Sequence, residues 1–272
     1  MLGDWPTEPG LWISLVVAGG AYALGVHRLR ARGKPWSSRR SASLAGGLLA
    51  IGAALVSPLA VYDEQLPVHM VQHLLLGKIG PLLLALSAPV TLVLRTIPRR
   101  PRITLVGVLH SRPIRLLAHP VTAITLFDGG FGALYFTPLY EATLRHPLLH
   151  ELVHTHFLIS GCLLAWTFVG LDPVPRLGSL RLRTALLIVA LGTHAALAKL
   201  LFAGYGSVRT GGVAQLHQGA EIMYYGGDFA DLMLLTAFFA QWYVREGRRL
   251  RRRQGTKEAA GRVVGGDLAA AG

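Results

Sequence analysis

Seven long, mainly apolar runs constrain the fold of this chain more than any other feature of its sequence. A helix needs about 20 residues to cross the ~30 Å hydrocarbon core of a bilayer. Inside lipid, every backbone N–H and C=O group must find a partner within the protein, which a helix provides by itself. The runs cover residues 11–28, 44–62, 68–95, 118–139, 148–171, 182–204 and 217–244. We therefore predict an all-α fold, a polytopic membrane bundle of about seven transmembrane helices.

The distribution of charge gives this bundle an orientation. Charged residues make up only 15% of the chain, against about 25% in soluble domains. The net charge of +13 would suggest nucleic-acid binding in a soluble protein. Here, however, 23 of the 27 Lys and Arg residues fall in the loops after the first, third and fifth spans and in the tail. Because cytoplasmic loops carry such an excess, we predict an external N-terminus, a cytoplasmic C-terminus and no nucleic-acid partner.

Composition divides the chain into two parts. We predict a transmembrane domain over residues 1–246 and a basic tail over residues 247–272. The basic run from Arg248 to Arg253 can contact anionic lipid head groups, and the Gly/Ala-rich stretch 254–272 is typical of disorder. No basic residue precedes the first span, so we expect that span to be retained rather than cleaved as a signal peptide. The single cysteine, Cys162, excludes an intrachain disulfide and a CxxC metal motif.

Two histidine pairs open predicted spans near the outer face. His69 and His73 begin the third span, and His150 and His154 begin the fifth. Residues four apart lie on one face of a helix, one turn from each other. Two imidazoles placed in this way can bind one metal ion. Glu151 lies about 100° away from its pair, so the pattern does not match the HExxH motif of zinc proteases.

Further polar residues lie within the predicted spans. Five of them project onto one face of the last span at about 100° per residue: His217, Glu221, Tyr224, Asp228 and Asp231. Ionisable side chains are costly in lipid, so we expect this face to point into the bundle. His194 and Asp128 lie in the sixth and fourth spans. Lys78 and Lys199 can each pair with an aspartate or extend to the interface.

Three segments resemble the CtaG family of cytochrome c oxidase assembly factors. They are HMVQHLLLGKIGPLLLALSAPVTLVLR, HPLLHELVHTHFLISGCLLAWTFVGLDP and HQGAEIMYYGGDFADLMLLTAFFAQWYVRE, within a match over residues 61–246. The resemblance implies a seven-helix protein of the bacterial plasma membrane that supplies copper to a haem–copper oxidase. The family positions carried over are His69, His73, His150, His154 and Asp228. Lys78 departs from the family pattern, because an apolar residue is expected there.

We interpret the chain as a copper-handling assembly factor rather than an enzyme, with haem–copper oxidase subunits as its partners. The predicted metal ligands are His69, His73, His150, His154, His194 and His217. The residues expected to orient imidazoles or carry protons are Asp128, Glu221, Asp228 and Asp231. Few sulfur ligands are available, which favours an exchangeable copper site.

Two alternatives stay open at this point. One is a membrane haem protein in which two histidines bind the iron. The other is a membrane di-metal oxygenase or hydrolase. A rhodopsin-like photoreceptor is excluded, because the last span contains no lysine for a Schiff base.

Overall fold

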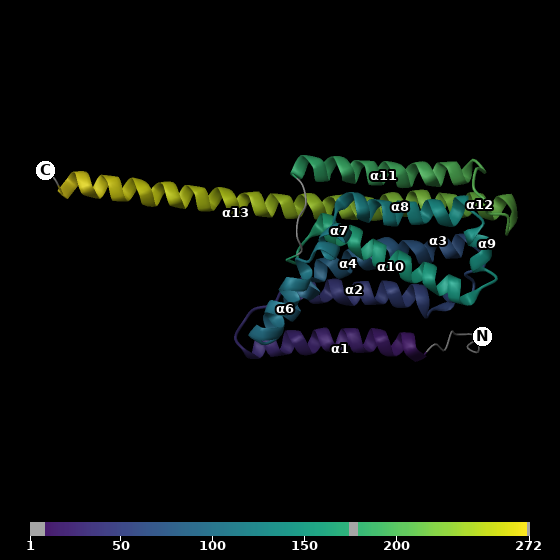
Figure 1. The fold of residues 1–272 in the computed structure, drawn as a ribbon, viewed down its shortest axis with the longest axis horizontal. Helices are drawn as coiled ribbons and strands as arrows, with labels where there is room; N and C mark the ends of the chain where they lie inside the picture. The colour runs from purple at the N-terminus through teal and green to yellow at the C-terminus, as the bar shows by residue number, and fades with distance from the viewer. Residues whose placement is uncertain (1–8, 174–178, 271–272) are drawn as a thin grey trace. The chain divides into compact units, whose positions relative to one another are not determined.

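The computed structural model describes residues 9–173 and 179–270, and every regular element within these ranges is helical (Figure 1). The first elements are α1 (Pro9–Ala31), α2 (Ser38–Leu55), the 3₁₀ turn η1 (Pro58–Ala60), α3 (Leu66–Leu74), the π-helical turn η2 (Leu75–Ile79), α4 (Gly80–Ser87) and α5 (Pro89–Thr96). The next are α6 (Arg99–Leu109), α7 (Arg112–Leu117), α8 (Pro120–Phe136), α9 (Leu139–Thr143) and α10 (Pro147–Val169). The last are α11 (Leu180–Phe202), α12 (Gly212–Glu221), the π-helical turn η3 (Ile222–Gly226) and α13 (Gly227–Ala270). The predicted all-α class is thus confirmed.

Four described stretches are long and apolar enough to cross a membrane. They are Gly10–Ala31, Leu66–Thr96, Pro147–Val169 and Leu180–Phe202, which correspond to the first, third, fifth and sixth predicted spans. The other three predicted spans fall on α2, on α8 and on the segment from α12 into α13. These four stretches make the chain a multi-pass helical membrane protein. The count of seven spans and the orientation in the membrane stay predictions.

The third span is bent at two places. The α-helix widens into the π-helical turn η2 just before Pro81, and the chain adopts a left-handed conformation at Ala88 (φ 52°) before Pro89 starts α5. Proline cannot donate a backbone hydrogen bond inside a helix, which accounts for the break at Ala88. A π-helical turn shifts the angular positions of the residues that come after it. Side chains before and after η2 therefore do not keep one helical face.

Helix α10 packs directly against η2, and two glycines make this approach possible. A Cβ atom on Gly161 would overlap the carbonyl group of Gly77. Small residues at such crossings let two backbones come together in a membrane bundle. Both segments run in the same direction, and before this crossing the rings of His73 and His154 lie with their centroids 5.4 Å apart. The crossing thereby places the two histidine pairs against each other.

The chain forms two compact units, one ending at Leu234 and one beginning at Leu235. The second unit consists of the later part of α13. Residues 254–270, which we expected to be disordered, continue this helix. The division into domains at residue 246 stays a prediction.

Candidate metal centre

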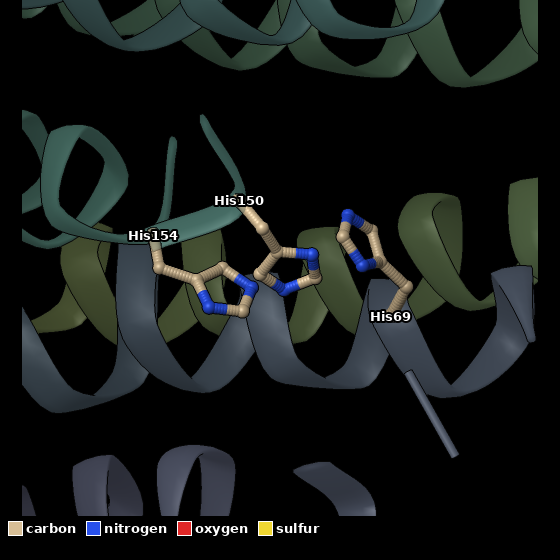
Figure 2. A group of neighbouring side chains, drawn as sticks. All are labelled: His69, His150 and His154. Atoms are coloured by element: carbon tan, nitrogen blue, oxygen red, sulfur yellow. The ribbon is translucent and has the colours of Figure 1, made fainter. Parts of the chain in front are cut away.

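Three imidazoles from two helices converge at the start of α3 and of α10. They belong to His69 in α3 and to His150 and His154 in α10 (Figure 2). Each ring contributes one nitrogen to a group in which all three atoms lie within 4.8 Å of one another. Both helices begin with a proline at the first or second position, where a missing N–H has no cost. The i, i+4 spacing on α10 then turns both of its imidazoles toward α3.

The cluster is closed on its inner side and reachable on its outer side. His69 and His154 are buried, with exposed fractions of 1% and 6%. The side chain of His150 keeps an exposure of 14%. Tyr140 of the short helix α9 packs edge-on against His69, with ring centroids 5.1 Å apart. An ion would therefore reach the cluster past His150.

Three ring nitrogens of the cluster have no hydrogen-bond partner in the part of the chain that the structure describes. They are Nδ1 of His69, Nε2 of His150 and Nε2 of His154, and all three are buried. Buried polar atoms are nearly always hydrogen-bonded, so each unpaired one calls for an explanation. Neutral imidazole nitrogens with free lone pairs are the donors that copper and zinc prefer. The residues present therefore fit a metal ion.

A carboxylate that we did not predict lies beside this cluster. Asp63 Oδ2, in the loop before α3, is 3.2 Å from His150 Nε2, although the direction does not satisfy a hydrogen bond. Partial burial raises the pKa of the Asp63 carboxyl, and the nearby His150 partly opposes this. Asp63 belongs to no helical pattern, so no local spacing in the sequence links it to His150. Its position supplies an oxygen donor at the entrance of the site.

His73 lies next to the cluster but in a different role from its three members. Its Nε2 atom is 2.8 Å from Nε2 of His69, within hydrogen-bond distance. Its ring packs edge-on against Phe157, with centroids 4.4 Å apart, and its exposed fraction is 0%. The structure therefore brings four of the six predicted ligands together and places three of them around one point.

The other two predicted ligands make different contacts. His194 in α11 places Nε2 3.3 Å from the carbonyl oxygen of Met223, and its ring packs on Phe131. His217 in α12 stacks on Phe202, with centroids 4.2 Å apart and planes at 18°. Neither belongs to the group of three nitrogens among the described residues. Their predicted role as ligands is not supported by this geometry.

The acidic stripe predicted on the last span does not form one face. The turn η3 interrupts the α-helix between Glu221 and Asp228, and a π-helical turn rotates by less than 100° per residue. Asp231 is buried, whereas Glu221 and Asp228 are exposed. The expectation of one inward face was wrong, because two of its three carboxylates lie on the exposed side of the helix. Asp128 in α8 is buried, and its Oδ2 atom has no hydrogen-bond partner within the described ranges.

The partner of the intramembrane lysine is now defined. Lys78 Nζ donates a hydrogen bond to Asp231 Oδ1 at 2.7 Å, and the two side chains are exposed by only 6% and 8%. Lys78 lies on η2 and Asp231 on α13, so the ion pair joins the two helices that contain π-helical turns. A small cavity of about 20 Å³ beside the pair is lined by Gly77 and Gly161 among others, and has room for about one water molecule.

Comparison with known proteins gives one family match and three uncharacterised mycobacterial relatives. Residues 20–245 match the family described as cytochrome c oxidase caa3 assembly factor (Caa3_CtaG). Uncharacterised proteins of Mycobacterium bovis and Mycobacterium tuberculosis are each 33% identical over 274 aligned positions, 93% of this chain and 41% of the relative. An uncharacterised protein of Mycobacterium leprae is 30% identical over 264 positions, 90% of this chain and 40% of that protein.

These matches differ in how much of each protein they cover. The chain spans about two fifths of the length of the curated relatives it matches. No solved structure matches it. The family match, in contrast, covers most of the chain and includes the three segments on which the resemblance was based, except for the last residue of the third, Glu246. The resemblance is confirmed, and the chain belongs to the cytochrome c oxidase caa3 assembly factor family.

Proposed function

We propose that this chain assembles a haem–copper cytochrome c oxidase by binding a copper ion at His69, His150 and His154 and passing it to an oxidase subunit. The observation that carries the proposal is the convergence of three imidazoles, each of which offers a nitrogen within 4.8 Å of the others and has a buried nitrogen without a hydrogen-bond partner among the described residues. Copper is the substrate that the chain carries, and the three imidazoles hold it only for the time of transfer. The bacterial plasma membrane is the proposed location.

The donor set supports copper as the cargo. Three imidazoles suit copper or zinc, whereas magnesium and calcium prefer oxygen donors. Sulfur is absent from the group of three, because Cys162 lies elsewhere on α10 and Met70 is packed in the core. A site with three protein ligands keeps a coordination position open, which favours exchange over storage. These properties suit a protein that gives its ion away.

The packing around the cluster supports a single ion over a haem. The ring centroid of His69 lies 5.6 Å from that of His150 and 5.8 Å from that of His154. The Tyr140 ring packs against His69, and the Phe157 ring packs against the adjacent His73. A porphyrin between two axial histidines would have to displace these aromatic rings. The bis-histidine haem alternative therefore has less support from this geometry.

The predicted orientation places the cluster on the outer side of the membrane. Asp63 and the partly exposed His150 form its entrance, so an external donor would meet them first. The ion would then reach the buried His69 and His154. A shallow, outward-facing site is accessible both to a donor and to the external domain of an oxidase subunit. The seven spans, the external N-terminus and the cytoplasmic C-terminus belong to this proposal.

The test compares metal content with oxidase assembly. Cells would carry the wild-type chain, His154→Leu or the control His156→Leu, whose Nε2 lies 3.0 Å from the Leu126 carbonyl oxygen outside the cluster. Each purified protein is loaded with Cu(I), and bound copper is measured by mass spectrometry. Copper in the oxidase is measured in the same membranes. We expect His154→Leu alone to lose both. Normal copper binding and normal oxidase in His154→Leu would overturn the proposal.

A further inference from the structure

A groove of about 460 Å³ lies between α1 and α2, which run side by side (Figure 1). Its floor is formed by the buried side chains of Tyr22, Val26 and Leu44. The Tyr22 hydroxyl is fixed, because it accepts a hydrogen bond from Trp36 Nε1 at 3.1 Å and donates one to the Ser87 carbonyl oxygen at 2.9 Å. Ligand sites in proteins commonly have volumes of about 300–1,000 Å³ and a preformed shape. The groove therefore has the size and the rigid floor of a binding site.

The rim of the groove is open, because the side chains along it are small. Ala23 on α1 and Ala45 on α2 line the groove, and both are exposed. In α1, only 11% of the apolar membrane-spanning window is buried, against 28–50% in the other three membrane-spanning stretches. The groove therefore opens toward the surrounding lipid.

The groove has the length of one leaflet of the membrane. It is lined from Gly19 to Arg30 along α1 and from Leu48 to Ser38 along α2. Gly19 and Arg30 are 11 positions apart, which is about 16 Å of helix at about 1.5 Å per residue. Half of the ~30 Å hydrocarbon core is about 15 Å. A lipid chain that lies along the groove would therefore reach from the interface to the middle of the bilayer.

The two ends of the groove differ in polarity. The end nearest the loop between the two helices is lined by polar and basic side chains, namely His27, Arg30, Ser38 and Ser41. The deeper end is lined by apolar residues and glycine, apart from Tyr22, whose hydroxyl is already hydrogen-bonded. Basic pockets between transmembrane helices are suited to anionic lipid head groups. This arrangement matches a ligand with a charged head and an apolar chain.

The charge around the polar end is entirely positive. Six Lys and Arg residues lie between positions 28 and 40, whereas residues 9–62 contain no Asp or Glu. None of the six forms an ion pair with a carboxylate in the part of the chain that the structure describes. Arg40 packs over the Trp36 ring, and Arg32 donates a hydrogen bond to the Thr96 carbonyl oxygen, whereas Arg30 lines the groove. This end therefore complements a negative charge that the neighbouring helices do not supply.

We infer that the α1–α2 groove binds one anionic phospholipid, with its head group at Arg30 and Ser38 and an acyl chain along Ala23 and Ala45. A free anion would occupy the polar end alone and leave the apolar end unfilled. An uncharged apolar chain would leave Arg30 without a counter-ion. A phospholipid satisfies both ends at once, and the inference does not depend on copper binding.

The experiment is native mass spectrometry of the purified, delipidated full chain, to which phosphatidylglycerol or phosphatidylcholine with the same acyl chains is added. Ala45→Trp fills the apolar part of the groove, and Arg30→Gln removes its cation. The matched controls are Leu49→Trp and Arg28→Gln, which change exposed residues of α2 and α1 outside the groove. We expect the wild type and both controls to bind one phosphatidylglycerol, and to bind it more tightly than phosphatidylcholine.

The two groove variants should differ from their controls. We expect Ala45→Trp to lose the bound lipid and Arg30→Gln to bind phosphatidylglycerol about fivefold more weakly. Because both residues are exposed, the variants should fold, which size-exclusion chromatography checks. Equal affinity for the two lipids, or wild-type binding by Ala45→Trp, would overturn the inference. Equal losses in Arg28→Gln and Arg30→Gln would also overturn it, since surface charge alone would then hold the lipid.

Two other occupants of the groove give results of their own. Displacement of the lipid by inorganic phosphate would assign the polar end to a free anion. Conversion of a dimer into a monomer by Ala45→Trp would assign the groove to a second copy of the chain. Either result would overturn the inference.

Discussion

Breaking the Lys78–Asp231 ion pair should destabilise the protein more than any exposed substitution on the same helix. In Asp231→Leu, the ammonium group of Lys78 loses the carboxylate 2.7 Å away while remaining buried, with an exposure of only 6%. Removing one partner of a buried pair costs about 3–5 kcal/mol, because an uncompensated charge stays inside. For a chain of this size, each kcal/mol lowers the Tm by about 2–4 °C, so we expect a loss of about 6–20 °C.

The double variant tests the cause of this loss. Replacing both partners, in Lys78→Met/Asp231→Leu, removes both charges from a cavity whose other lining residues are apolar or glycine. Such replacements are often neutral or stabilising, so the double variant should recover most of the lost stability. The matched control is Asp228→Asn, an exposed carboxylate three residues earlier on α13, with an expected change within about 0.5 kcal/mol.

The assay is thermal unfolding of the purified protein in one mild detergent, followed by intrinsic fluorescence. A Tm of Asp231→Leu equal to that of the wild type would show that the ion pair does not stabilise the fold. A double variant as unstable as Asp231→Leu would show that lost packing, and not an unpaired charge, causes the effect.

Three other outcomes are expected from the geometry. Copper at about 100 times its Kd should stabilise the wild type by about 2.7 kcal/mol and His154→Leu by much less; equal Tm shifts in a copper titration would contradict this. Gly161→Leu should abolish stable folding, because its Cβ would overlap the Gly77 carbonyl; a normal yield of folded protein by size-exclusion chromatography would exclude this. Glu141 accepts a hydrogen bond from the Thr210 side chain at 2.6 Å. Partial burial raises the pKa of Glu141, but the hydrogen bonds that its carboxylate accepts, including the one from Thr210, lower the pKa overall. The carboxylate therefore stabilises the fold above the unfolded pKa of about 4.3 and loses this effect as the pH falls through its lower folded pKa. Glu141→Gln should accordingly have a lower Tm than the wild type at neutral pH, and the difference should vanish in acid; a difference independent of pH would oppose this account.

The histidine pairs show how far local sequence information extends. The i, i+4 spacing on α3 and α10 is a property of any α-helix, so it could be read directly from the residue numbers. The position of one helix relative to the other could not be read from the residue numbers, because it depends on the crossing at Gly77 and Gly161. Asp63 was missed for the same reason: it joins His150 only after α3 and α10 have packed.

The last span shows where periodicity fails. The projection of Glu221, Asp228 and Asp231 onto one face assumed 100° per residue along the whole segment. The π-helical turn η3 breaks this assumption, and no residue type in the sequence announced it. The partner of Lys78 could not be chosen among three aspartates until the rotation of α13 was known.

The membrane class, the all-α fold, the family and the pairing of histidines along each helix could all be predicted from the residues alone. These properties depend on hydrophobicity and on contacts between residues a few positions apart. The tertiary structure alone decided that His69, His150 and His154 converge, that His73 contacts His69 through Nε2, and that Lys78 pairs with Asp231. The physical reason is that these contacts depend on how each helix is rotated about its axis. That rotation is set by close packing and by the two π-helical turns, which local periodicity does not reveal.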